Sequence, residues 1–418
     1  MHVVILTYGS RGDVEPFLSL AQGLQRSGHH ARVAGPVVFA KLAEERGVEF
    51  VPLPGDPDSL VADLVRRAGH NPARMVRVMS RYVLPLAMDV MRAIEPACDG
   101  ADVVVHSFLF TNGGHDVAVR KGIPDVSAQM FPVFTPTAAF PGVVAPDLPF
   151  GDGYRRLTHR LIQGAFWHGS RLLYGRIQKE HPDEPPLTGW PIGGHLSPPV
   201  PVLYAYSKHI LPRPEDWPDW AHVTGYWFPE LRDDDQATEG LVRFLASGPP
   251  PVYLGFGSVI SGDPARLAQI AVRALDQCGR RGVIVTGSGG LRLGDVPPHV
   301  YAVEQVRHDW LFPRVAAAVH HGGAGTTGAS LRAGLPTLIV PFTTDQPFWG
   351  RQVHRRGAGP APIKPRRLTP ARLAEAIEEL FTNERMRTSA AAIGEGIRGE
   401  SGVANAITVI ERAVARKH

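Results

Sequence analysis

Short apolar runs alternate with amphipathic segments along the chain. Residues 3–7 form a β-branched run, and residues 14–26 follow with Phe17, Leu18 and Leu24 at helical spacing. Further runs of strand type lie at 31–34, 48–53, 101–106, 126–130 and 202–207. Short apolar strands that alternate with helices are typical of a parallel, doubly wound sheet. We therefore predict an α/β fold with a Rossmann-like sheet in the first half of the chain.

The second half of the chain repeats this pattern. Strands are expected at 251–255, 283–286, 300–303, 316–319 and 337–341, and helices at 264–277, 371–381, 385–396 and 403–414. A length of 418 residues suits two domains. We predict a first domain over 1–228, a linker over 229–237 and a second domain over 238–418 that includes the C-terminal helix. Ligands of open α/β sheets bind at the strand ends, so we expect the ligand cleft between two such domains.

Composition narrows the class of protein. Apolar residues make up 44% and charged residues 20%, as in an ordinary globular protein. The net charge is +4 and the pI about 9.1, but Lys and Arg are spread along the chain, so we expect no nucleic acid partner. The aspartates at 233–235 lie in the predicted linker, where consecutive acids are usually solvated, so no metal site is predicted.

Cysteine use and hydropathy bear on the compartment. Cys98 and Cys278 are far apart, which supports neither a disulfide framework nor a cysteine metal site and favours a reducing cytoplasm. The chain shows no secretory leader and no apolar run of the ~20 residues that a spanning helix needs. Residues 153–179 form a basic amphipathic helix, for which we favour packing by the apolar face over weak contact with a membrane surface. No pattern assigns an oligomeric state.

The segment from residue 316 to 350 has the features of an anion site. A short apolar strand ends at His320, His321 and two glycines, and a helix then begins with Gly325, Thr326 and Thr327. Free N–H groups and the positive end of the helix dipole therefore lie above the strand end. The glycines at 323, 325 and 328 also satisfy G-x-G-x-x-G, with Asp345 about 20 residues further on, as in a dinucleotide enzyme. An NAD(P)-dependent Rossmann enzyme is therefore an alternative.

Aromatic residues gather where the expected strands at 101–106 and 126–130 of the first domain end. They are Phe108, Phe110, Phe131, Phe134 and Phe140, and several lie among prolines. Aromatic residues at such places can belong to the core. They also suit a pocket that buries a rigid apolar ligand. We predict that they bind a lipophilic small molecule.

Several longer strings resemble one known family. They are GSRGDVEPF at residues 9–17, PVYLGFGS at 251–258, HDWLFP at 308–313 and HHGGAGTTGASLRAGLP at 320–336. The chain resembles the GT-B nucleotide-sugar glycosyltransferases, and within them the sterol glucosyltransferases and the bacterial enzymes that glycosylate antibiotic aglycones. The resemblance implies two Rossmann-like domains, the first for the acceptor and the second for the donor. It also implies inverting transfer of a hexose from a UDP- or dTDP-sugar to a hydroxyl of a lipophilic sterol or polyketide-like acceptor, without a metal or other cofactor.

The resemblance also implies roles for single residues. Asp13 matches the catalytic base, although an Asp at this place is also a preferred helix cap and a dipole would make it a weaker base. His106 is an expected orienting partner of Asp13, and a core histidine is the alternative. The residues expected to bind the donor are Ser258, Val303, Val306, His321, Gly323, Gly325, Thr326, Thr327, Asp345 and Gln346. A catalytically silent sugar- or lipid-binding protein of the same fold is a further alternative.

Overall fold

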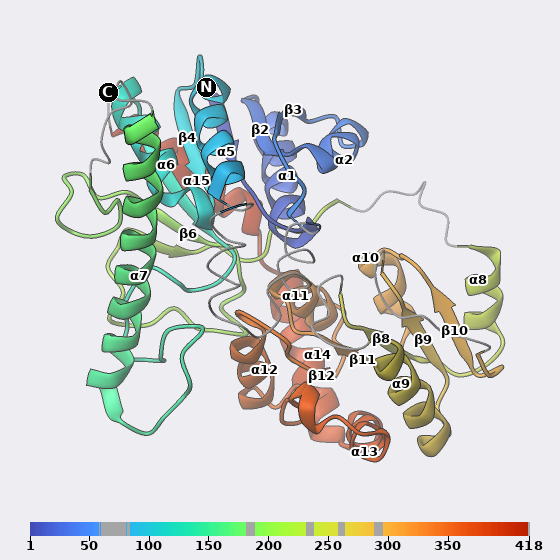
Figure 1. Ribbon diagram of the computed structural model, residues 1–418. Helices are drawn as coiled ribbons and strands as arrows, with labels where there is room; N and C mark the ends of the chain where they lie inside the picture. The colour runs from blue at the N-terminus through green and yellow to red at the C-terminus, as the bar shows by residue number, and fades with distance from the viewer. Residues whose placement is uncertain are drawn as a thin grey trace. The chain divides into compact units, whose positions relative to one another are not determined.

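The computed structural model describes residues 1–57, 59, 81, 84–180, 189–230, 238–257, 264–287 and 296–416 (Figure 1). The chain divides into two compact units. The first contains Met1–Tyr206, Arg213–Pro229 and Ser401–His418, and the second contains Ser207–Pro212 and Glu230–Glu400. The predicted linker at 229–237 lies mostly outside the described residues.

A seven-stranded sheet forms the centre of the first unit, in the order β3-β2-β1-β4-β5-β6-β7. All of its neighbouring strands pair in parallel. Residues 3–6 of β1 and the whole of β4 are buried, which explains why these strands read as continuous apolar runs and not as alternating patterns. The strands are β1 (His2–Leu6), β2 (His30–Pro36), β3 (Glu49–Leu53), β4 (Val103–His106), β5 (Asp125–Gln129), β6 (Val202–Tyr204) and β7 (Ala221–Val223).

Helices connect these strands. The apolar stripe of α1 buries Val14, Phe17 and Leu18 against β1 residues such as Val3 and Ile5. The predicted basic helix is observed as α7, a long helix that stands out in Figure 1. The helices of this unit are α1 (Arg11–Arg26), α2 (Ala40–Glu45), α5 (Leu84–Ala97), α6 (Thr111–Lys121) and α7 (Gly151–Glu180), with short 3-10 turns η1 (Val37–Phe39) and η3 (Phe108–Phe110).

The C-terminal helix α15 (Gly402–Ala415) packs in the first unit, not in the second as we expected from the sequence. Its residues Ala406, Ile407 and Ile410 join the core that α1 forms with the sheet. The helix start is tied to the same unit, because Asn405 Nδ2 donates a hydrogen bond to the carbonyl oxygen of Thr224 at 2.9 Å. The apolar stripe of a terminal helix does not indicate which domain core the helix packs against. From the sequence we therefore assigned this helix to the domain that precedes it in the chain.

The second unit repeats the architecture around a smaller sheet, whose order is β10-β9-β8-β11-β12. Its strands are β8 (Val252–Gly255), β9 (Gly282–Val285), β10 (Val300–Val303), β11 (Ala317–His320) and β12 (Thr337–Ile339), all paired in parallel. The described helices are α8 (Glu239–Ala246), α9 (Pro264–Cys278), α10 (His308–Leu311), α11 (Ala324–Arg332), α12 (Gln346–Arg355), α13 (Pro370–Thr382) and α14 (Glu384–Arg398), with turns η4 (Phe312–Arg314) and η5 (Pro365–Arg367).

The two sheets confirm the predicted α/β fold class. In both, the first strand of the unit lies inside the sheet and the chain first extends to one side and then to the other, as in a doubly wound fold. Cys98 and Cys278 are both free, which agrees with the absence of a disulfide framework. Within the described residues, no helix has the length and apolar character needed to cross a membrane.

Candidate functional site

Each sheet has one point where the winding direction of the chain reverses. In the first sheet this point lies between β1 and β4, and in the second between β8 and β11. Open α/β sheets bind ligands outside the carboxyl ends of the strands at such a point. The loop after β1 leads to Asp13, and β4 ends at His106. In the second unit, the register places His320 opposite Gly255, so the loops after β11 and β8 begin side by side.

Asp13 lies in the first turn of α1, and Ser10 holds its carboxylate. The backbone N–H and the hydroxyl of Ser10 both donate to Asp13 Oδ2, at 2.8 Å and 2.9 Å. Gly9 makes room for this carboxylate: it has φ +144°, and a Cβ there would lie 2.4 Å from Asp13 Oδ2. Ser10, and not Asp13, is therefore the N-cap of α1, and Asp13 is its N3 partner in a capping box. The role of Asp13 as a base stays a prediction.

His106 pairs with a different carboxylate, that of Asp125. Its Nε2 lies 2.9 Å from Asp125 Oδ2, and the Nδ1 of His115 lies 2.9 Å from the same oxygen. Burial alone would raise the pKa of Asp125, but the hydrogen bonds from both histidines outweigh it and lower that pKa. The buried pairing with Asp125 agrees with the core-histidine interpretation of His106. Its Nδ1 has no hydrogen-bond partner in the described structure, and assistance to Asp13 stays a prediction.

Two neighbouring histidines at the end of β11 have different surroundings. His320 is fully buried; its Nδ1 accepts a hydrogen bond from the N–H of Gly322 at 3.0 Å, and its Nε2 lies 3.2 Å from Ser330 Oγ. It therefore fastens the glycine turn to α11. The ring of His321 instead lies between glycines, since a Cβ at Gly323 would be 2.7 Å from its Nε2 and one at Gly257 would be 3.1 Å from its Cε1.

The environment of His321 keeps its ring neutral. Burial lowers the pKa of His321 to about 4, and a hydrogen bond to the backbone of Gly255 offsets only part of this effect. Within the described residues its Nδ1 is buried without a hydrogen-bond partner. A neutral imidazole can donate one hydrogen bond and accept another. This side chain can therefore bind a polar ligand at the strand end.

The N-terminus of α11 offers further donors at the same place. Gly323 is the N-cap and no side chain caps this helix end. The first backbone bond of the helix runs from Thr327 N to Gly323 O at 2.9 Å, so the N–H groups of residues 324–326 have no helical partner. Thr327 Oγ1 is buried without a partner in the described structure. Together these groups form an anion cradle of the kind that binds phosphate.

The predicted sugar-binding pair lies next to this cradle. A Cβ at Gly322 would lie 3.3 Å from the carbonyl oxygen of Gln346, which shows how closely the two loops pack. Gln346 Oε1 accepts hydrogen bonds from the N–H groups of Phe342 and Thr343, at 2.7 Å and 3.1 Å. Its amide nitrogen therefore remains the donor end of the side chain. Asp345 Oδ2 accepts from the indole of Trp349 at 2.9 Å.

The remaining donor-site predictions fall in different places. Val303 ends β10 at the edge of the second sheet, and Val306 follows it; both are partly buried against the cluster that contains Leu311 and Phe312. They do not lie on the strands that form the cradle. Ser258 lies outside the described residues, although Gly257 just before it borders His321.

The predicted acceptor residues divide into a cluster and two core positions. Phe108 stacks on Phe134 with ring centroids 5.4 Å apart and lies equally close to Phe131. Two aromatic residues that were not predicted, Phe166 of α7 and Trp190, complete this aromatic cluster. The ring centroid of Phe166 lies 4.9 Å from that of Phe108, and the ring centroid of Trp190 lies 5.2 Å from that of Phe134. Within it Phe134 is fully buried, whereas Phe108 and Phe131 are partly exposed.

Phe110 and Phe140 do not join the aromatic cluster. Phe110 packs in the core between α5 and α6 with Val104 and Val117. Phe140 is buried against His159 and Trp217, with ring centroids 5.8 Å and 6.4 Å away. Their surroundings are those of ordinary core aromatics.

Comparison with known proteins decides the family. Residues 3–97 match the model of the glycosyltransferase family 28 N-terminal domain, and residues 274–403 match that of the C-terminal domain of erythromycin biosynthesis protein CIII-like proteins. A sterol 3-beta-glucosyltransferase of Arabidopsis thaliana is 34% identical over 423 residues, which cover 99% of this chain and 68% of that relative. The chain belongs to the GT-B glycosyltransferase family.

Other members of the GT-B glycosyltransferase family show the same likeness. A second sterol 3-beta-glucosyltransferase of Arabidopsis thaliana is 35% identical, over 97% of this chain and 64% of that relative. A sterol 3-beta-glucosyltransferase of Cryptococcus neoformans is 34% identical, over 99% of this chain. The chain spans only 27% of the length of the fungal relative, so the relatives contain further sequence.

Solved GT-B structures show the same fold over nearly the full chain. The glycosyltransferase of kitacinnamycin has a TM-score of 0.73 at 20% identity and covers 99% of both chains. The calicheamicin glycosyltransferase has a TM-score of 0.69 at 21% identity and covers 99% of this chain and 98% of that one. At these identities the likeness concerns the fold.

Sequence reasoning missed several polar residues at the strand ends of the first unit of this GT-B protein. Ser107 Oγ, Asn112 Oδ1 and Gln129 Oε1 are buried without hydrogen-bond partners in the described structure. Ser107 directly follows β4 and Gln129 ends β5, where a ligand would approach. Asp125 was missed because it is the first residue of β5. At that position the sequence pattern does not indicate whether a carboxylate is buried or exposed to solvent.

Proposed function

We propose that the protein is an inverting glycosyltransferase that moves a hexose from a UDP- or dTDP-sugar to a hydroxyl of a lipophilic acceptor. The observation that carries this proposal is the cradle at the end of β11, where the uncapped start of α11, the ring of His321 and Gln346 converge. The names of the curated relatives, sterol 3-beta-glucosyltransferases, support a sugar transfer to a sterol-like acceptor. A related solved structure, that of the glycosyltransferase VinC, is a complex with dTDP, which supports a nucleotide diphosphate donor.

The second unit would hold the donor. Backbone N–H groups at the start of α11, with Thr327 and His321, would bind the diphosphate and stabilise the charge that grows on it as the sugar leaves. A neutral His321 would do this by donating a hydrogen bond and not by charge. Asp345 and Gln346 would bind sugar hydroxyls. Val303 and Val306 would lie on the side that faces the base.

The first unit would bind the acceptor and supply the base. In the reaction, the acceptor oxygen forms a bond to the anomeric carbon while the bond from that carbon to the diphosphate oxygen breaks. The acceptor proton passes to the Asp13 carboxylate, and attack from the opposite face inverts the anomeric centre. The aromatic cluster around Phe108 would bury the apolar body of a sterol or polyketide-like aglycone.

We also propose that transfer needs no metal ion, because the α11 start and His321 would supply the donors that a metal would otherwise provide. A chelator should then leave the initial rate of transfer unchanged. Loss of activity with EDTA that a divalent ion restores would contradict this part of the proposal.

Contact with a membrane surface is a further part of the proposal, since lipophilic acceptors partition into membranes. The loop before α7 and the helix itself expose Val144, Phe150, Leu161 and Leu172, at 62%, 69%, 62% and 73%. Arg160, Arg171 and Arg176 of the same helix are exposed as well. Apolar and basic residues on one exposed helix suit an anionic lipid surface. A cytoplasmic location stays a prediction.

One screen tests the proposed function. Purified protein is incubated with UDP-glucose, UDP-galactose and dTDP-sugars against a panel of sterols and polyketide aglycones, and products are detected by mass spectrometry. We expect an acceptor whose mass rises by one hexose, and no such product with Asp13→Asn. A parallel incubation with NAD(P)H tests the dinucleotide alternative, which oxidation of that cofactor without any sugar transfer would support. Donor binding without any turnover would favour the silent binding protein.

A further inference from the structure

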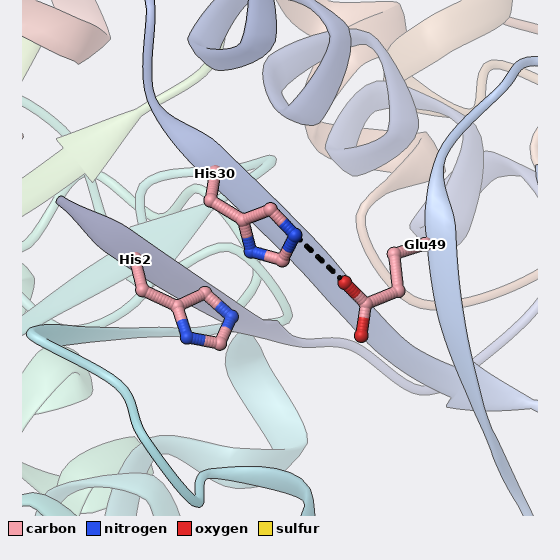
Figure 2. A group of neighbouring side chains, drawn as sticks. All are labelled: His2, His30 and Glu49. Carbon is pink, nitrogen blue, oxygen red and sulfur yellow. Dashed lines mark ion pairs between the residues drawn. The ribbon is translucent and has the colours of Figure 1, made fainter.

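Three side chains that can bind a metal ion lie together at the amino ends of the first three strands in the sheet order β3-β2-β1. They are His2 of β1, His30 of β2 and Glu49 of β3 (Figure 2). Their ligand atoms all lie within 4.8 Å of one another. Within the described residues, no other group of three such side chains comes as close.

The strand register explains this arrangement. His2 is opposite His30 on the neighbouring parallel strand, and Glu49 is opposite Arg32, two residues beyond His30. Residues opposite each other, or two apart on one strand, share a face of the sheet. The three ligands therefore project from one face, and their separation follows from the spacing of neighbouring strands, about 5 Å.

The ring of His2 is already oriented as a metal ligand. Its Nδ1 lies 2.9 Å from the carbonyl oxygen of Gly100, which can only accept, so Nδ1 carries the proton of the neutral ring. The lone pair then lies on Nε2, which is buried without a hydrogen-bond partner in the described structure. Histidines that bind metals are commonly held in this way, with the other nitrogen donating to a carbonyl group.

His30 and Glu49 supply the other two ligands. His30 Nε2 lies 3.0 Å from Glu49 Oε2, and the His30 side chain is 60% exposed, so an ion can enter from solvent. The rings of His2 and His30 are adjacent, with centroids 4.5 Å apart. A bound ion would take the place of the proton between His30 Nε2 and Glu49, and that proton would move to His30 Nδ1. Arg32 holds the other oxygen of Glu49 at 2.6 Å and keeps the carboxylate in position.

We infer that His2, His30 and Glu49 form a binding site for a divalent transition-metal cation of the zinc class. Two imidazole nitrogens and one carboxylate oxygen are a ligand set that zinc accepts, with a water molecule as fourth ligand. The ion would link β1, β2 and β3 at the amino ends of the strands. Asp13 follows the opposite end of β1, so the site would stabilise the sheet and take no part in sugar transfer.

The test uses the full chain without a polyhistidine tag, which would itself bind zinc. The protein is treated with a chelator, dialysed and titrated with Zn²⁺ by calorimetry, and its melting temperature is measured with and without the ion. We expect one zinc ion per chain and a higher melting temperature with zinc. His30→Gln, which keeps a hydrogen-bond partner for Glu49, should lower zinc affinity by at least about 10-fold, and so should His2→Ala.

A matched control is His29→Gln. His29 lies next to His30 in the chain and pairs with a carboxylate, Glu411, at 3.0 Å, but it belongs to no group of three ligands among the described residues. Zinc affinity should be unchanged in this variant. Equal zinc binding by the wild type, His2→Ala and His30→Gln, or no saturable binding by the wild type, would overturn the inference. Neither result depends on glycosyl transfer, which the donor and acceptor screen tests separately.

Discussion

Gly322 packs directly on Gln346, so closely that a Cβ at Gly322 would lie 3.3 Å from the Gln346 carbonyl oxygen. The two residues are far apart in the chain, one in the glycine turn after β11 and the other at the start of α12. Their contact brings the start of a second helix beside the anion cradle. A ligand that carries both a diphosphate and a sugar can therefore meet His321 and Gln346 at once, and the following predictions test this arrangement.

Asp13→Asn should lower the rate of transfer by about 100- to 10,000-fold while affinity for the nucleotide diphosphate stays within error. The amide cannot take the acceptor proton, but its oxygen can still accept the two hydrogen bonds from Ser10. Steady-state kinetics and calorimetry measure the two effects.

Ser10→Ala is the matched control for Asp13. It removes the hydroxyl that binds Asp13 but leaves the carboxylate, so stability should fall by about 1 kcal/mol with turnover largely kept. If Asp13→Asn turned over like the wild type, Asp13 would be a helix cap only.

His321→Ala should weaken binding of UDP or dTDP by about 10-fold or more and slow transfer together, because the imidazole is assigned to the leaving group. Calorimetry with both nucleotides measures the affinity. His354→Ala serves as control, since His354 is an exposed histidine of the same unit that contacts the carbonyl oxygen of Gly359. Equal nucleotide affinity in both variants would remove His321 from the donor site.

The lowered pKa of His321 predicts a pH dependence of stability. Burial lowers the pKa of His321 from 6.5 to about 4 in the folded protein. Between these values the unfolded chain binds more protons at this position, so the free energy of unfolding falls as the pH drops through the window and is fully restored above the upper value. His321→Gln removes this contribution.

Urea unfolding near pH 7 and near pH 4.5 measures the effect, and the wild type should lose about 2 to 3 kcal/mol more than His321→Gln. Buried histidines such as His320 are present in both proteins and cancel in the comparison. An equal loss in the two proteins would contradict the lowered pKa.

The parts of the fold that sequence could predict are those with local signals. The β-branched runs predicted most strands, because a strand that is buried on both faces is a continuous apolar run in the sequence. The glycine turn after such a run predicted the cradle around His321, because the turn residues directly follow the strand. The short strand β7 (Ala221–Val223) was missed, since three residues carry too little pattern. Two features could not be predicted, because they depend on contacts between segments that are distant in the chain. They are the packing of α15 in the first unit and the pairing of His106 with Asp125.

Vesicle binding tests the exposed surface of α7. The protein should sediment with vesicles that contain phosphatidylserine and much less with phosphatidylcholine alone, and salt should weaken the binding. Leu161→Ser and Leu172→Ser together should reduce it, because these side chains are 62% and 73% exposed and contribute apolar area. Stability should hardly change. Binding that is equal for both lipids and both proteins would favour a solvated helix.

The last prediction separates an acceptor-binding aromatic residue from a core one, which the sequence could not do because both are simply phenylalanine. Phe108 is partly exposed at the end of β4, so Phe108→Ala should raise the acceptor KM by about 10- to 100-fold through loss of apolar contact. Phe140 is buried against Trp217 and His159, so Phe140→Ala should instead cost about 3 to 5 kcal/mol of stability.

Kinetics at saturating donor and urea unfolding of both variants distinguish the two effects. Donor affinity should be unchanged in Phe108→Ala, since the aromatic cluster belongs to the first unit and the cradle to the second. If Phe108→Ala lost stability and kept the wild-type acceptor KM, the aromatic cluster would be core. The unpartnered polar atoms of Ser107 and Gln129 would then be the next positions to test, because these residues lie at the carboxyl ends of β4 and β5 and could bind the acceptor hydroxyl.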